Sequence, residues 1–262
     1  MVTINITTFN RQRLTKVCIE SLMASTKRDQ FELIVVDNNS TDGTVKMLKR
    51  MKKRGIIDKL ILNSENKHLG FAVNQAWKIA APSSKWVVWC NNDFYFMKGW
   101  LDNLKKVIKA TGVDYVSCLY LEGLTRNKIS PGIPKVSGNG GRYLEQTLRR
   151  KKKFDVGSGP AVSRSALKLN KIKVQERPFQ KGYTGPGPNF YRQLNEAGLK
   201  GVRLDKPAIL KQDPEFNNPE YKDYYNNTFQ SRGLMKVLNL YQKKGFVKNK
   251  KLYYQGTDYV KE

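Results

Sequence analysis

Cysteine is scarce in this sequence, and its scarcity excludes a disulfide-stabilised fold. The chain of 262 residues has only Cys18, Cys90 and Cys118, an odd number. All three lie in apolar segments that look helix-like or strand-like. We therefore expect reduced thiols in the core of a cytosolic protein rather than a disulfide framework.

Long hydrophobic runs and two familiar sequence signals are also missing. Apolar runs such as residues 85–90 are far shorter than the roughly 20 residues that cross a bilayer. The chain starts directly with a strand-like run, which leaves no room for a signal peptide, so we expect a cytoplasmic location, in the host cell if the protein is viral. The absence of a G-x-x-x-x-G-K-S/T segment excludes a P-loop nucleotide hydrolase.

Acidic residues are few relative to basic ones. There are 48 Lys and Arg against 22 Asp and Glu, which gives a net charge of +26 with the larger surplus in the second half. Such an excess favours a polyanionic partner: nucleic acid, an anionic lipid surface or an acidic polymer. The alternative is that the basic faces are merely solvated, as in a lysine-rich proteome.

Strand-like and helix-like segments alternate through the first 118 residues. This alternation is typical of an α/β fold with a mostly parallel sheet and helices on both faces. Strands are expected at 2–9, 31–36, 59–62, 86–90 and 115–118, and helices at 13–24, 41–53, 70–80 and 98–109.

The pattern changes after residue 118. Residues 120–153 are rich in Gly, Pro, Ser and Asn and end in a basic run, which is typical of a functional or mobile loop. A strand is expected at 154–156 and a helix near 189–197, ended by Gly198. We expect a catalytic domain at 1–214, with a nucleotide-binding half (1–118) and an acceptor half (119–214), and a helical Tyr- and Lys-rich C-terminal extension at 215–262.

Polar segments follow each of the first four expected strands. They are residues 7–11, 37–44, 66–74 and 91–93. Ligands of open α/β sheets bind beyond the carboxyl ends of the strands, so all four segments should meet at one rim.

The side chains in these segments suit a nucleoside diphosphate. Asp37 can accept hydrogen bonds from a base or ribose, and Arg11 can pair with phosphate. Gly70 allows a close backbone approach at a helix start. Asp93 could hold a divalent ion that bridges the diphosphate. Taken singly, each segment could instead be a helix cap, a turn or a polar helix face, and His68 is an incidental turn residue.

In this order the segments resemble the family 2 glycosyltransferases, which have the GT-A fold. The resemblance runs from Thr3 to about Pro214. TTFNR resembles the opening T-x-N-R segment and VDNNSTDGT the V-D-(N/D)-x-S-x-D-x-T segment. NKHLGFAVNQAW is similar to the N-x-G-x-x-x-x-N block of rhamnosyl-transferring members, and CNND stands at the metal-binding D-x-D or N-x-D. VGSGPAVSRSAL resembles a later S-G segment that ends in Arg.

The resemblance implies a nucleotide-sugar donor, with a uridine diphosphate sugar favoured, and Mn²⁺ or Mg²⁺ as cofactor. Asp93 would be the principal metal ligand, with Asn91 beside it. Gly159 would let the backbone approach the donor sugar or the acceptor. Together with Gly159, the expected donor-binding residues are Thr7, Phe9, Arg11, Asp37, Asp42, Gly70, Asn74 and Asn92, of which Asp42 could serve only as a cap.

Two departures from the family leave the general base and a metal ligand open. The family usually has an acidic pair before a helix ending in A-G, but residues 185–189 here carry no carboxylate. The base, which takes the proton of the acceptor, could be Asp155, Glu176 or Asp213. A histidine that often completes metal binding is also replaced near Asp213, which is either an oxygen ligand or part of a strand-end turn.

The acceptor is the least determined part. The charge, the run of basic residues and the C-terminal tyrosines would suit DNA, such as a hydroxymethylated base in a bacteriophage genome. A cell-surface or lipid-linked glycan at an anionic membrane is the alternative. A hypothesis of another class is a non-catalytic nucleic-acid-binding module. The expected polyanion-binding run is Arg149, Arg150, Lys151, Lys152 and Lys153.

Overall fold

The structure is a computed structural model that describes part of the chain. The described residues are 1–117, 133–136, 142–145, 159–176, 186–204, 209–211, 247–248 and 251–252. The expected strand at 154–156 lies outside these residues, and so does the expected helical extension at 215–262 except for 247–248 and 251–252, which are strands rather than helix.

A nine-stranded sheet forms the centre of the molecule, in the order β3-β2-β1-β4-β9-β6-β10-β8-β7. β3, β2, β1 and β4 are parallel, β9 is antiparallel to both of its neighbours, and β10 is parallel to β6. The mostly parallel sheet expected from the sequence is confirmed. The strands are β1 (Val2–Thr8), β2 (Phe31–Asp37), β3 (Lys59–Leu62), β4 (Trp86–Asn91), β6 (Tyr115–Ser117), β7 (Ile133–Val136), β8 (Arg142–Glu145), β9 (Pro160–Ser163) and β10 (Gly201–Leu204).

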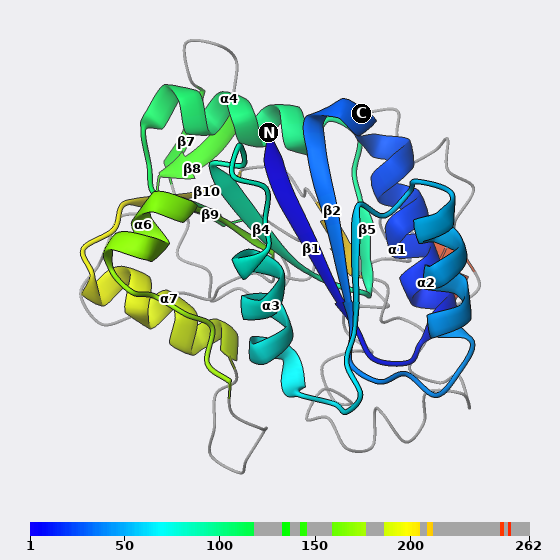
Figure 1. The fold of residues 1–262 in the computed structure, drawn as a ribbon. Helices are drawn as coiled ribbons and strands as arrows, with labels where there is room; N and C mark the ends of the chain where they lie inside the picture. Colours follow the sequence, from blue (N-terminus) through cyan, green and yellow to red (C-terminus); the bar gives the residue numbers. More distant parts are fainter. Residues whose placement is uncertain are drawn as a thin grey trace.

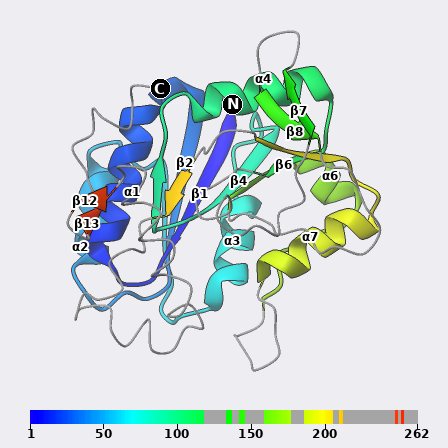
Figure 2. The ribbon, with the colours of Figure 1, turned by 180° about the vertical axis from the view of Figure 1, so that it is seen from behind.

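Helices cover both faces of this sheet (Figure 1; Figure 2 shows the reverse view). One core cluster joins Ile4 and Leu33 to α1, α2 and α4, and the other joins Ile34 and Trp89 to α3, α6 and α7. Neighbouring strand residues belong to opposite clusters because side chains alternate across a strand. The helices are α1 (Gln12–Ser25), α2 (Thr44–Lys53), α3 (His68–Lys78), α4 (Trp100–Thr111), α6 (Arg164–Leu169) and α7 (Pro186–Glu196).

The two central strands are buried along their whole length. Every residue of β1 and β2 is buried, including the polar Thr3 and Asn5. Burial on both faces fits the nearly continuous apolar run of β2, whereas β1 alternates Val2, Ile4 and Ile6 with polar residues that are buried all the same.

Most expected helix bounds agree with the structure within a few residues. α2 begins at Thr44 rather than at residue 41, because residues 38–43 form a loop that is needed at the rim. Gly198 has a φ of 67°, as a left-handed helix-ending glycine should. Cys18 and Cys90 are buried free thiols, as expected, whereas Cys118 lies outside the described residues.

A short strand pair, separate from the central sheet, follows β4. β5 (Phe94–Phe96) pairs antiparallel with β11 (Ile209–Lys211), and Lys211 lies opposite Phe94. The end of β11 is therefore next to the residue that follows Asp93. A further pair, β12 (Val247–Lys248) and β13 (Lys251–Leu252), is antiparallel.

Gly201 should be irreplaceable for packing at the β6–β10 pair. A Cβ at this position would lie 2.0 Å from Cζ of Tyr115, whose buried ring packs on Tyr191 with 5.8 Å between centroids. We expect Gly201→Ala to lower the free energy of unfolding by about 1–3 kcal/mol, as overpacking does. Urea unfolding measures this. Gly187→Ala, which would meet no atom within 4 Å, is the control; equal stability of the two variants would contradict this packing.

Candidate functional site

The four polar loops expected from the sequence meet at the carboxyl ends of β1, β2, β3 and β4. We call them loop 1 (residues 9–11), loop 2 (38–43), loop 3 (63–67) and loop 4 (91–93). In Figure 1, loops 1 to 3 lie together at the lower end of the sheet. Hydrogen bonds connect each loop to the next in the order in which their strands lie in the sheet.

Loop 1 and loop 4 are connected through a buried arginine. Arg11 is 7% exposed, and its Nη2 donates to Oδ1 of Asn92 at 2.5 Å. Its Nη1 lies 3.7 Å from Oδ2 of Asp93, whose side chain is 5% exposed. A buried guanidinium beside a buried carboxylate compensates a charge that would otherwise be costly to desolvate.

Asn92 is the centre of this contact. Besides accepting from Arg11, it donates through Nδ2 to Oγ1 of Thr15 at 2.9 Å and to Oγ1 of Thr8 at 3.1 Å. The two threonine hydroxyls are 3.0 Å apart. A single amide thus fixes loop 4 to the end of β1 and to the first turn of α1.

Loop 1 and loop 2 exchange hydrogen bonds. The backbone N–H of Asn10 donates to Oγ of Ser40 at 2.7 Å, and Oδ1 of Asn10 accepts from the N–H of Thr41 at 2.8 Å. Asp42 accepts from the N–H groups of Gln12 and Thr44, the first residues of α1 and α2. Asp42 therefore caps two helices, in agreement with the expectation that it could serve as a cap.

Asp37 organises loop 2 from inside. Its carboxylate is buried and accepts from the N–H of Ser40 at 2.9 Å and from the Ser40 hydroxyl at 2.5 Å. Each carboxylate oxygen can accept a second hydrogen bond, so binding of a base or ribose by Asp37 stays a prediction.

Loop 2 also connects to loop 3 and to the start of α3. Asn38 donates to the carbonyl of His68 at 3.2 Å and accepts from Asn63 at 2.8 Å. With this contact all four loops belong to one hydrogen-bonded rim.

Several residues of these loops have a left-handed backbone conformation although they are not glycine. Asn10, Arg11, Asn39 and His68 have φ values of 54°, 62°, 67° and 63°. Such conformations are costly outside glycine, and they cluster where a fold must hold a functional geometry. Within the described part of the chain, these four left-handed residues lie in the rim loops or directly beside them.

Gly70 and Asn74, expected to bind the donor, both contact the segment that follows α6. A Cβ at Gly70 would lie 1.9 Å from the carbonyl O of Gln175. The Asn74 amide donates to the carbonyl of Val174 at 2.8 Å and to Oε1 of Glu176 at 2.7 Å, and it accepts from the N–H of Val174 at 3.1 Å. These two residues hold segment 172–176 on α3; donor binding by them stays a prediction.

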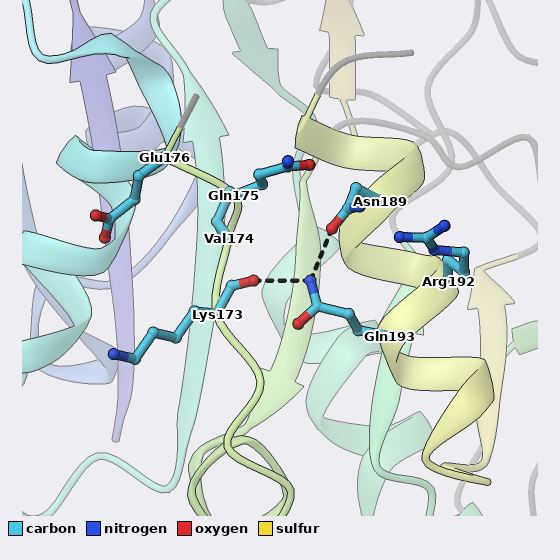
Figure 3. Close-up of a pocket in the computed structure, with 7 residues that line it drawn as sticks. All are labelled: Lys173, Val174, Gln175, Glu176, Asn189, Arg192 and Gln193. Atoms are coloured by element: carbon cyan, nitrogen blue, oxygen red, sulfur yellow. Dashed lines mark hydrogen bonds between the residues drawn. The ribbon is translucent and has the colours of Figure 1, made fainter. Parts of the chain in front are cut away.

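A cavity of about 440 Å³ lies between this segment and α7 (Figure 3). Gln193 spans it by donating to the carbonyl of Lys173 and to Oδ1 of Asn189, both at 2.9 Å. The carboxylate of Glu176 points away from α7 toward α3 in Figure 3. None of the loop 1, loop 2 or loop 4 residues lines this cavity, so it is separate from the rim.

Loop 4 offers oxygen ligands to a cation. Oδ1 of Asn91 is buried and has no hydrogen-bond partner among the described residues. Asp93 adds a carboxylate two positions later, so a hard cation fits these two residues. Within the described ranges no three His, Cys, Asp or Glu residues form a metal-binding group, so further ligands would come from a bound diphosphate or from residues outside these ranges.

The thiol of Cys18 supports loop 4 from α1. Its Sγ donates to the carbonyl of Asn91 at 3.5 Å, and burial raises the pKa of the thiol well above its usual range. Cys18 therefore stays a protonated hydrogen-bond donor rather than a reactive thiolate.

The remaining predicted residues divide into two groups. Thr7 is buried opposite Asn91 in the β1–β4 register, and Phe9 is 38% exposed at the rim. Gly159, with a φ of 95°, precedes Pro160, which pairs with the last residue of β6, so it also lies at the rim edge. The second group lies outside the described residues: Asp155, Asp213 and the run 149–153.

Sequence reasoning missed the residues that assemble the rim. Asn10 and Ser40 stand inside the segments TTFNR and VDNNSTDGT, yet had no assigned role. Thr8 also stands inside TTFNR without a role of its own, Thr15 is expected only as a helix residue, and Cys18 only as a reduced core thiol. Their contacts join segments distant in sequence, so only the fold shows them.

The central sheet with this rim places the protein in the α/β class with a GT-A fold. Residues 3–169 match the family model described as glycosyl transferase family 2. Because this match covers more than half of the chain, the chain belongs to glycosyl transferase family 2. No curated protein matches the sequence.

Solved structures agree on the fold. Residues 1–349 of S. aureus TarS match with a TM-score of 0.64 and 18% identity, covering 92% of this chain and 72% of that chain. The same fragment in complex with UDP-GlcNAc matches with a TM-score of 0.64 and 17% identity, with the same coverage. The mannosyltransferase PcManGT from Pyrobaculum calidifontis, in complex with GDP-Man and Mn²⁺, gives a TM-score of 0.59 and 14% identity over 94% of this chain and 76% of that chain.

Where the structure describes the chain, none of its helices has the length and apolarity to span a bilayer.

Removing the amide of Asn92 should destabilise the whole rim. Asn92→Ala deletes the acceptor of Arg11 and the donor to two buried threonines, and unmet buried groups cost about 1–3 kcal/mol. We expect a loss of that size in urea unfolding. Asn170→Ala, which removes a single hydrogen bond at the exposed end of α6, is the control and should cost less. An Asn92→Ala protein as stable as the wild type would refute the central position of this amide.

Proposed function

We propose that the chain transfers a sugar from a nucleotide-sugar donor, with a uridine diphosphate sugar favoured, to an acceptor hydroxyl. The observation that carries this proposal is the rim, where four connected loops surround Arg11, Asn92 and Asp93 at the carboxyl ends of parallel strands. The family and the nucleotide sugars named with the two similar structures agree with it.

In this proposal Asp37 and loop 1 bind the nucleoside. Asp37 accepts from the base or ribose, and Thr7 and Phe9 line the pocket. Phe9 is the exposed aromatic of loop 1, so its ring is available to pack on a planar base.

Asp93 and Asn91 would hold a divalent cation, Mn²⁺ or Mg²⁺. When bound, the cation neutralises charge on the leaving diphosphate. Arg11 orients Asp93 and Asn92 from within the protein. A direct contact between Arg11 and phosphate stays a prediction.

Glu176 is the proposed general base among the described residues. α7 has no acidic residue in its first turn. The carboxylate that the family has at this position is therefore missing here. Glu176 lies on the segment fixed to Gly70 and Asn74, and its Oε1 accepts from Asn74 at 2.7 Å. Asp155 and Asp213 are the alternatives. Asp213 follows Lys211, the last residue of β11, by two positions, so it is also the proposed third metal ligand.

For the acceptor we propose a hydroxymethylated base in DNA, as in bacteriophage genomes. The net charge of +26 supports a polyanionic acceptor. A cell-surface or lipid-linked glycan is the second candidate, favoured by the same charge.

Offering labelled UDP-sugars with hydroxymethylated DNA or with bacterial surface glycans separates the two acceptors, because the label enters only the true acceptor.

Asp93→Ala should abolish turnover without unfolding the protein. Metal-ion stabilisation of a leaving group is worth several kcal/mol, so we expect kcat/KM for Mn²⁺-dependent UDP-sugar hydrolysis to fall at least about 100-fold. Asp102→Ala, which removes an exposed carboxylate of α4, should retain activity. Circular dichroism checks the fold, and Asp93→Asn keeps the side-chain shape if the alanine variant is unstable. Wild-type turnover in both Asp93 variants would refute the metal assignment.

Neutralising residues 149–153 to Gln should weaken acceptor binding and reduce its salt dependence. Each lost phosphate contact lowers the slope of log K against log salt by about 0.9 for duplex DNA. Fluorescence anisotropy over a KCl series measures the slope. An unchanged slope would remove this run from the polyanion site.

A further inference from the structure

Helix α2 carries an uninterrupted basic surface that the donor site does not use. α2 and the residue that follows it contain no acidic residue, and six cations on them are exposed. We call them the α2 basic face: Lys46, Lys49, Arg50, Lys52, Lys53 and Arg54.

Carboxylates do not neutralise this face in the part of the chain that the structure describes. Lys52 donates to the backbone carbonyl of Asp58 rather than to its side chain. The Asp58 carboxylate is engaged by Nη2 of Arg28 and by the N–H of Leu33. By contrast, Lys59, just outside this face, is paired with Glu32 at 2.7 Å.

The cations are arranged at helical spacing. Lys46, Arg50 and Arg54 follow one another at intervals of four residues, with Lys49 and Lys53 alongside them. Arg50, Lys52 and Lys53 lie in the last turn of α2, where cations favour the helix dipole. Lys46 and Lys49 lie before that turn, and like charges four residues apart destabilise a helix by about 0.2–0.5 kcal/mol per pair, so helix stability does not explain the whole arrangement. From residue 46 to 54 the helix rises about 12 Å, which equals the axial rise of three to four base pairs of duplex DNA.

The opposite side of α2 rules out insertion into lipid. Met47, Leu48 and Met51 are buried in the core shared with α1 and the sheet. A helix that lies in a membrane interface needs its apolar side free. The exposed cations of α2 can therefore bind anions only at the surface of the helix, and their repeat along it is complementary to the regularly spaced phosphates of a nucleic acid.

The α2 basic face begins within the first turn after the donor rim and runs away from it along the helix. Thr44, the first residue of α2, directly follows loop 2, and α2 lies at the outside of the molecule beside α1 (Figure 1). We infer that the α2 basic face binds the phosphate backbone of a nucleic acid. This inference goes beyond the proposed function, because it holds whether or not the nucleic acid receives the sugar.

The test compares two variants that lose the same charge. The first carries Lys46→Gln, Lys49→Gln, Arg50→Gln and Lys53→Gln. The control carries Lys78→Gln, Lys98→Gln, Lys109→Gln and Lys168→Gln, which are exposed cations on other helices and loops. Binding of a fluorescent 20-base-pair duplex of arbitrary sequence is measured by anisotropy over a KCl series.

We expect the α2 variant to lose at least tenfold in duplex affinity and its salt slope to fall by about 3–4, while the control keeps the wild-type slope. Equal losses in both variants would show an effect of net charge alone and overturn the inference. Retained binding to phosphatidylserine vesicles without duplex binding by the wild type would also overturn it, in favour of a membrane. Mn²⁺-dependent hydrolysis of UDP-sugar without DNA should be the same in both variants, so failure of the donor site is detected separately.

Discussion

The buried contact of Arg11 with Asn92 and Asp93 is the constraint on which the site depends. It holds a buried carboxylate just after β4, because the guanidinium of Arg11 from loop 1 lies beside it. Asn10 and Arg11 both have a left-handed backbone, and Asn10 bonds to loop 2 while Arg11 bonds to loop 4. One local conformation therefore sets the positions of loops 1, 2 and 4 together, and the cation and diphosphate of the proposed donor would bind to a preformed rim.

A second fixed element lies on the face of the sheet that α3 covers. Gly70 lets the backbone of Gln175 approach α3, and Asn74 holds both Val174 and Glu176. This attachment keeps a carboxylate beside Asn74, in the middle of α3, in a chain whose α7 has no acidic residue in its first turn. The proposed division of work follows from these positions, with donor binding on loops 1, 2 and 4 and proton transfer from segment 172–176.

The sequence predicted the sheet and the location of the rim because both follow from short-range patterns. Continuous apolar runs such as 31–36 and 86–90 and polar residues directly after them are visible without a structure. The protein partners of those polar residues are not visible: the sequence does not show that Arg11 contacts Asn92 or that Gly70 packs against the backbone of Gln175. Buried charges and amides find their partners across long sequence separations, and only the packed fold decides which partner each one takes.

Paramagnetic broadening in NMR spectra shows directly whether the donor and its cation bind at the rim. Mn²⁺ added together with UDP broadens resonances near the bound ion. We expect the strongest broadening at residues 91–93, followed by 7–11 and 37–40, and weak broadening at α4 and at the cavity beside Gln193. Broadening centred on that cavity or on α4, with loop 4 unaffected, would contradict a donor site at the rim.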